Sequence, residues 1–169
     1  RLAGQPQAFA VMGHSRLVTN GTQVRDENNQ PVVKDGVIGI HNGIIVNDAD
    51  VWSRHTEIHR TYEIDTEVML ALVRKHLRDG REVAAAVATA VKEMFGTVAA
   101  AFLFDDLDAL AIATNNGSLY FLSDGRGLFA FASEEYFLSE LARVMDLDTN
   151  AGFPIRHVVP GTGIVLGLN

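Results

Sequence analysis

The sequence predicts one domain of layered α+β architecture, in which antiparallel sheets pack against helices. Three observations favour this class: strand-like runs near the N-terminus, two helical segments in succession, and a later series of short strand-like runs interrupted by one helix. A repeating βαβ unit would instead alternate strand and helix along the whole chain. At 169 residues with 47% hydrophobic content, the chain is long enough for one core and too short for two comfortable ones.

The N-terminal part predicts strands over residues 8–12, 37–40 and 44–46. The last two are joined by His41-Asn42-Gly43, and Asn-Gly tolerates the positive φ angles of a tight turn. The residue pattern therefore favours a plain hairpin with Asn42 and Gly43 at its tip. The alternative is functional, because an Asn side-chain amide beside a Gly backbone N–H offers the two donors of an oxyanion hole.

Two helices follow in succession. The first is expected to begin at Asp65 as N-cap and to end at Gly80. Its apolar stripe consists of Val68, Met69, Leu72, Val73 and Leu77. The second covers Glu82 to Met94, with Val83, Val87, Val91 and Met94 on the face that would lie on a sheet.

The C-terminal part predicts mainly short strands, over residues 97–104, 109–113, 119–122, 128–132, 155–159 and 163–166. The last two flank a turn at Pro160-Gly161. A helix over residues 134–144 places four apolar side chains on one face: Phe137, Leu138, Leu141 and Met145.

Composition excludes several function classes. A net charge of -7 and an isoelectric point near 5.3 leave no basic face for nucleic acid. The apolar runs fall short of the ~20 residues that cross a bilayer, so no membrane partner is expected, and the cytoplasm is the default location. The chain contains no cysteine, which excludes a disulfide and a thiolate nucleophile within it.

Charged side chains suggest a site for a small zwitterion. Arg16 follows a predicted strand end, where a lone arginine is most often a surface residue, but its planar fork also suits a carboxylate. Asp65 is most simply a helix cap, and alternatively a carboxylate that holds an ammonium group. Together they would define a site for a free amino acid.

Two metal alternatives are weaker. His55 and His59 have the i, i+4 spacing of a zinc pair if they are helical, but the sequence offers no third ligand. The acidic run 105–108 lacks the glycine and terminal glutamate of a calcium loop, which favours an acidic turn. We therefore expect neither a metal nor another cofactor.

Four segments in order resemble the class II glutamine amidotransferase domain, an N-terminal-nucleophile glutaminase, and most closely its glucosamine-6-phosphate synthase branch. The family motif His-Thr-Arg-Trp-Ala-Thr-His-Gly corresponds to residues 14–21, Asn-Ala-His-Pro to residues 29–31 less one residue, His-Asn-Gly-Ile-Ile to residues 41–45, and Thr-Asp-Thr-Glu to residues 64–67. The order continues through Phe95-Gly96-Thr97 and Ala132-Ser133-Glu134, so the resemblance covers nearly the whole chain.

The resemblance implies a four-layer αββα sandwich of two antiparallel sheets, with glutamine as substrate. The α-carboxylate of glutamine would bind Arg16, helped by Thr19 and Asn20. Asn42 and Gly43 would form the oxyanion hole, and Asp65 would hold the α-amino group. Leu17 stands where the family has Trp, and Asn20 where it has His; these departures would either alter the pocket wall or mark a different branch of the family.

In this family the nucleophile is an N-terminal cysteine whose own amino group acts as base, whereas position 1 here is Arg. We therefore expect residues 1–169 to be a single amidotransferase domain that lacks an upstream segment and belongs to a longer chain. It would release ammonia from glutamine to a synthase or transferase domain, in cis or in trans, and a homo-oligomer is left open. The alternative is a catalytically silent glutamine-binding or regulatory module of the same fold.

Overall fold

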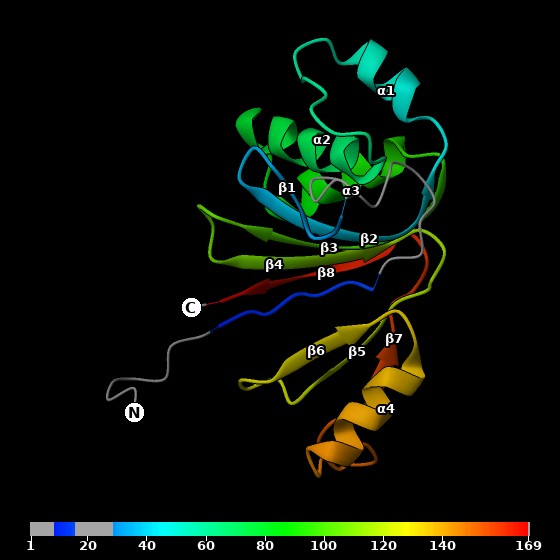
Figure 1. Ribbon diagram of the computed structural model, residues 1–169. Helices are drawn as coiled ribbons and strands as arrows, with labels where there is room; N and C mark the ends of the chain where they lie inside the picture. The colour runs from blue at the N-terminus through cyan, green and yellow to red at the C-terminus, as the bar shows by residue number, and fades with distance from the viewer. Residues whose placement is uncertain (1–8, 16–28, 169) are drawn as a thin grey trace.

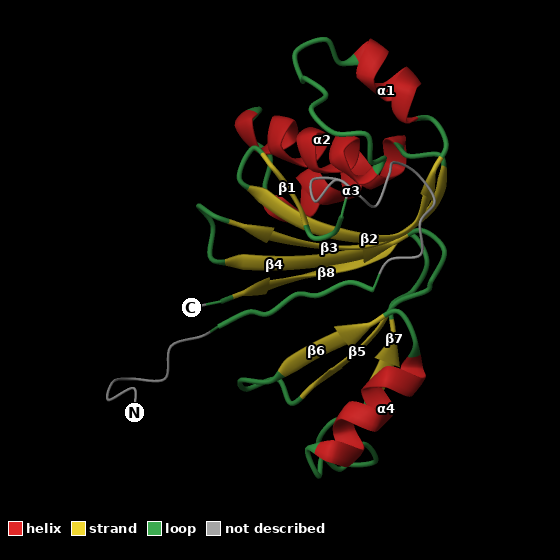
Figure 2. Cartoon of the chain, viewed as in Figure 1, coloured by secondary structure: helices red, strands yellow, loops and turns green. Residues whose placement is uncertain are grey.

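The computed structural model describes residues 9–15 and 29–168, which form two antiparallel sheets stacked between helices (Figure 1). Helices α2 (Thr66–Arg78) and α3 (Val83–Glu93) cover the outer face of the larger sheet. Helix α4 (Glu135–Val144) covers the outer face of the smaller one, as Figure 2 shows. The four layers therefore run helix, sheet, sheet, helix, and the predicted αββα sandwich is confirmed.

The larger sheet has five strands in the order β1-β2-β3-β4-β8. Their bounds are Val32–Lys34 for β1, Val37–Ile45 for β2, Gly96–Phe104 for β3, Ala109–Thr114 for β4 and Thr162–Gly167 for β8. All neighbours are antiparallel, and β2 pairs with β3 over its full length, from Val37 opposite Phe104 to Ile45 opposite Gly96. This long pairing makes β2 and β3 the centre of the molecule.

The smaller sheet has three strands in the order β6-β5-β7. Their bounds are Phe129–Ala132 for β6, Tyr120–Ser123 for β5 and Ile155–His157 for β7. Leu138 and Ala142 of α4 pack against this sheet through Leu122. The predicted strand positions in the C-terminal half are confirmed to within a few residues.

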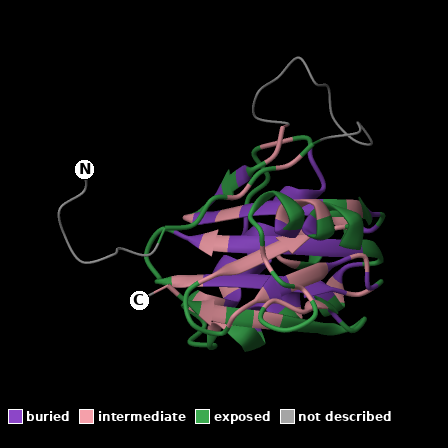
Figure 3. Cartoon of the chain, turned by 90° about the horizontal axis from the view of Figure 1, so that it is seen from below, coloured by how far each residue is buried: buried purple, intermediate pink, exposed green. Residues whose placement is uncertain are grey.

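Alternation along β2 separates two cores. Val37 and Ile45 face the helices and pack with α2 and α3, whereas Ile40 faces the smaller sheet and packs with Ala99 and Ile112. The helix side is the larger of the two cores, and Figure 3 shows many buried residues along the strands. Within the described residues, no helix is long and apolar enough to span a bilayer.

The hairpin expected at Asn42-Gly43 is wrong, because β2 continues through both residues without a turn. The tight turn lies earlier, at Asp35-Gly36, whose φ angles of 51° and 79° join β1 to β2. A strand paired residue by residue with β3 cannot reverse at Asn42. The chain therefore does make a tight turn in this region, but at Asp35-Gly36 and not at Asn42-Gly43.

Two other local expectations fail, and one short helix was not expected. Residues 9–12 form no strand, with Phe9 and Val11 more than four-fifths exposed. The predicted apolar face of α4 is only half right, because Phe137 and Met145 are exposed and Ala142 takes their place in the core. The short helix α1 (Asp48–Arg54), which contacts α2, was not predicted.

Candidate active site

The centre of the candidate site is the stretch of β2 from His41 to Ile45. Because β2 is a single strand, Asn42 lies on the same face as Ile40, toward the smaller sheet, while His41 is buried on the helix side. The His41 ring bridges two elements there, with Nε2 3.0 Å from the Thr97 carbonyl oxygen and Nδ1 3.5 Å from Thr66 Oγ1. Asn42 is thus presented to the space between the sheets by a buried neighbour.

Gly43 is a position at which only glycine fits. Its φ is 142°, and a Cβ added to it would lie 2.0 Å from the carbonyl oxygen of Thr97 on β3. Strand alternation directs the N–H of Gly43 away from β3, toward the outer edge of β2. The Asn42 side chain and the Gly43 N–H therefore leave the same short stretch, one from its face and one from its edge.

Asp65 lies against this outer edge. Asp65 is 5% exposed, and its Oδ2 accepts a hydrogen bond from the backbone N–H of Ile45 at 2.8 Å. The predicted role as a side-chain N-cap is wrong: Asp65 occupies the N-cap position of α2 with φ −64° and ψ −26°, but makes no capping hydrogen bond. The carboxylate is used instead to fix the start of α2 against β2.

A buried ion pair holds the loop that leads to Asp65. Glu67 is fully buried and accepts the backbone N–H groups of Thr61 and Tyr62 at 2.8 and 2.7 Å. Its partner Lys34 lies at 2.8 Å and also donates to the carbonyl oxygen of His59. Because β1 carries Lys34 and α2 carries Glu67, the pair ties the loop to the sheet and places Asp65.

A cavity of about 390 Å³ lies between the two sheets, on the side to which Asn42 points. Its walls are mainly apolar or small, with the polar side chains of His14, Ser15, Asn42 and Ser133 among them. Phe131 and Phe137 close the side formed by the smaller sheet and α4. A mainly apolar cavity with a few polar groups is the usual form of a small-molecule site.

The structure places three of the predicted site residues near the C-terminal end of β2. Asn42 and Gly43 lie on this strand, and Asp65 accepts the N–H of Ile45, two residues after Gly43. Of these three, only Asn42 lines the cavity. Arg16, Thr19 and Asn20 lie outside the described residues.

Three residues near the site were missed or misjudged from the sequence. Phe137 was expected in the core of α4 but is a cavity wall, 55% exposed. Glu67 and Gln30 were included only as parts of the motifs at residues 64–67 and 29–31, without an individual role. The long-range partners of Glu67 and Gln30, Lys34 and His41, leave no periodic signal in a single sequence.

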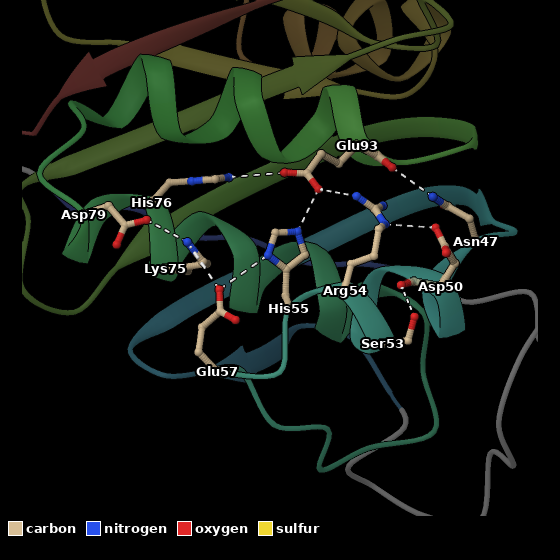
Figure 4. Close-up of polar contacts among 10 residues, drawn as sticks. All are labelled: Asn47, Asp50, Ser53, Arg54, His55, Glu57, Lys75, His76, Asp79 and Glu93. Atoms are coloured by element: carbon tan, nitrogen blue, oxygen red, sulfur yellow. Dashed lines mark hydrogen bonds and ion pairs between the residues drawn. The ribbon is translucent and has the colours of Figure 1, made fainter.

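A second polar cluster lies in the helix layer and includes His55, one of the two histidines considered as a zinc pair (Figure 4). Helix α1 ends at Arg54, so His55 and His59 do not share a helix face. His55 Nε2 instead lies 2.8 Å from Glu93 Oε2, and Arg54 Nη1 lies 3.2 Å from the same oxygen. Burial acts to raise the pKa of Glu93, but the hydrogen bond from His55 and the nearby positive charges hold that pKa below its ordinary value.

The acidic run at 105–108 forms bends, as expected of an acidic turn. The two oxygens of Asp106 face the guanidinium of Arg74 at 2.8 and 3.0 Å. Asp105 is the second partner of the same arginine. In the described part of the chain, no group of three or more acidic or histidine side chains has the arrangement of a metal site.

Comparison with known proteins agrees with this geometry. Residues 14–140 match the glutamine amidotransferase domain family. Curated relatives include two glutamine–fructose-6-phosphate aminotransferases (isomerizing). The protein from Bradyrhizobium diazoefficiens is 33% identical over 141 residues, covering 80% of this chain and 22% of the relative. The one from Rhizobium meliloti is 31% identical over 170 residues, covering 99% and 26%.

Solved structures show the same fold at lower identity. Glutamine phosphoribosylpyrophosphate amidotransferase from B. subtilis aligns with a TM-score of 0.63 and 21% identity, over 91% of this chain and 32% of that one. The chain spans about a quarter of the length of the curated relatives that it matches. Since the family match covers more than half of the sequence, this chain belongs to the glutamine amidotransferase domain family.

Proposed function

We propose that this domain binds glutamine and holds its side-chain amide for hydrolysis, so that ammonia is released to a partner synthase or transferase domain. The observation that carries the proposal is the placement of Asn42, Gly43 and the Asp65 contact within four residues of β2, with Asn42 lining the cavity between the sheets.

In this proposal different polar groups bind different parts of the glutamine molecule. Asp65 holds the α-ammonium with the carboxylate that also takes the Ile45 N–H, and Arg16 holds the α-carboxylate with help from Thr19 and Asn20. The Asn42 side-chain amide and the Gly43 N–H donate to the oxygen of the scissile amide. That oxygen becomes negatively charged when the amide carbon is attacked, so two donors aimed at it lower the barrier.

The attacking group is proposed to be a cysteine thiolate outside these 169 residues, because the chain itself contains no thiol. Attack forms a C–S bond, cleavage of the C–N bond releases ammonia, and water then hydrolyses the thioester to glutamate and the free thiol. We propose that the domain is part of a longer protein, as in its curated relatives, and that the ammonia acceptor lies in cis or in trans.

The test is glutamate and ammonia release from glutamine by the full-length product of the native gene. Asn42→Ala should lower kcat by about 100- to 1000-fold with little change in KM, the effect of losing one oxyanion donor. Asn150→Ala is the matched control, since Asn150 is an exposed loop residue near β7.

Calorimetry with glutamine separates the remaining outcomes. Binding of glutamine without glutamate release would show that the domain is a catalytically silent glutamine-binding module and not a hydrolase. Absence of both binding and release would refute the proposal in either form.

A further inference from the structure

The outer edge of β2 is uncovered by β1 where the candidate oxyanion hole lies. The pairing of β1 with β2 runs from Lys34 opposite Val37 to Val32 opposite Gly39 and goes no further. From His41 onward, the backbone groups on that edge therefore need partners other than a strand.

A glutamine side chain supplies the first of those partners. Gln30 Nε2 donates to the carbonyl oxygen of His41 at 2.8 Å, and Gln30 Oε1 accepts the N–H of His41 at 2.5 Å. This paired donor and acceptor reproduces the two hydrogen bonds that a strand residue would make with His41. The side chain thus extends the ladder of β1 by one residue.

Asp65 supplies the next partner on the same edge, through the N–H of Ile45 at 2.8 Å. Residues at i and i+2 of a strand direct their backbone groups to the same edge, so the N–H of Gly43 lies between these two attachments. Side chains from two distant segments therefore fix the strand immediately before and after Gly43.

We propose that Gln30 is a positioning residue for the oxyanion donors Asn42 and Gly43. It acts through His41 and does not itself touch the substrate. The inference rests on the proposed function, because it concerns the direction of the same two donors. Oxyanion stabilisation depends on donors held close to the productive geometry, and a misplacement of about 1 Å can cost about 100-fold in rate.

Gln30→Ala should therefore lower kcat by about 10- to 100-fold while KM for glutamine stays within about twofold, in the full-length enzyme. Gln30→Glu keeps an acceptor for the His41 N–H but loses the donor to the His41 carbonyl, so its kcat should also be lower than that of the native enzyme. It also serves as the second variant if Gln30→Ala does not fold. A KM rise with unchanged kcat, or no change in either, would overturn the inference.

Asn47→Ala is the matched control. The Asn47 side chain also makes a paired set of backbone hydrogen bonds, donating to the Glu93 carbonyl at 2.9 Å and accepting the Phe95 N–H at 2.8 Å. Those bonds tie the junction between β2 and α1 to the segment between α3 and β3, and neither involves the backbone groups of His41 or Gly43. The control variant should lose stability with kcat unchanged; an equal fall in kcat would reduce the role of Gln30 to general stability.

Amide hydrogen exchange by NMR decides the inference independently of catalysis. In Gln30→Ala the His41 amide should exchange at least about tenfold faster, because its acceptor is gone, and the Gly43 amide resonance should shift. Asn47→Ala should leave both signals in place. If the native enzyme shows no glutaminase activity, the proposed function fails, whereas unchanged His41 and Gly43 amides in Gln30→Ala would refute the positioning role itself.

Discussion

Asp65 is expected to have two roles, one in stability and one in substrate binding, and two substitutions should separate them. One carboxylate oxygen accepts the Ile45 N–H at 2.8 Å, in a residue that is only 5% exposed, and the negative charge is proposed to hold the substrate ammonium. Asp65→Asn keeps an oxygen that can accept the Ile45 N–H but removes the charge. Asp65→Ala removes both.

The magnitudes follow from these contacts. A hydrogen bond to a charged group contributes about 1.5–3 kcal/mol, and a buried N–H left without a partner costs about as much. Asp65→Ala should therefore lower the free energy of unfolding by about 1.5–3 kcal/mol, a large part of the ~5–15 kcal/mol typical of a domain. Asp65→Asn should lower it by less than about 1 kcal/mol. Loss of the charge should weaken glutamine binding by about 10- to 150-fold in both variants.

Urea unfolding and calorimetric titration with glutamine measure the two duties on the same samples. The two variants should differ in stability and agree in their loss of affinity. Native affinity for glutamine in Asp65→Asn would contradict the assignment of the ammonium to this carboxylate. Native stability in Asp65→Ala would contradict the structural duty.

Three further predictions follow from buried or constrained groups. Glu67→Gln breaks a buried ion pair and should lower the free energy of unfolding, measured in urea, by about 3–5 kcal/mol. As the control, Asp79→Asn removes an exposed i, i+4 ion pair and should lower it by less than about 1 kcal/mol. Equal losses in the two variants would contradict this prediction. Gly43→Ala should cost at least about 3 kcal/mol or abolish folding, because its Cβ would meet the Thr97 carbonyl oxygen; a stable, active variant would show that the strand can shift. Backbone hydrogen bonds from Arg126, Leu128 and Gly127 lower the pKa of Asp124 from 3.8 to about 2. The stability that these hydrogen bonds contribute is therefore complete above about pH 4 and is lost as the pH falls through about 2. An NMR titration of Asp124 with a midpoint near 3.8 would contradict this prediction.

Elements with strong local periodicity could be predicted from the sequence. The stripe from Val68 to Leu77 specified α2, and the apolar positions Val87, Val91 and Met94 specified the buried face of α3. Each pattern repeats over about three turns, so local information was sufficient. The four-layer arrangement followed from the resemblance to a known family.

Features set by distant partners could not be predicted in this way. The Asn42-Gly43 dipeptide has the composition of a turn, but nine residues of pairing with β3 keep β2 extended. Asp65 has the composition of a helix cap, but the uncovered edge of β2 takes its oxygen. Phe137 fits the apolar period of α4, yet the cavity between the sheets leaves it half exposed. In each case a tertiary contact outweighed a local preference.

The most direct test of the central claim is a crystal structure of the full-length protein with glutamine bound. In that structure the side-chain amide oxygen of glutamine should lie within hydrogen-bond distance of Asn42 Nδ2 and the Gly43 N–H, with the α-ammonium at Asp65. Glutamine bound away from β2, for example in the groove between α3 and β8, would contradict it.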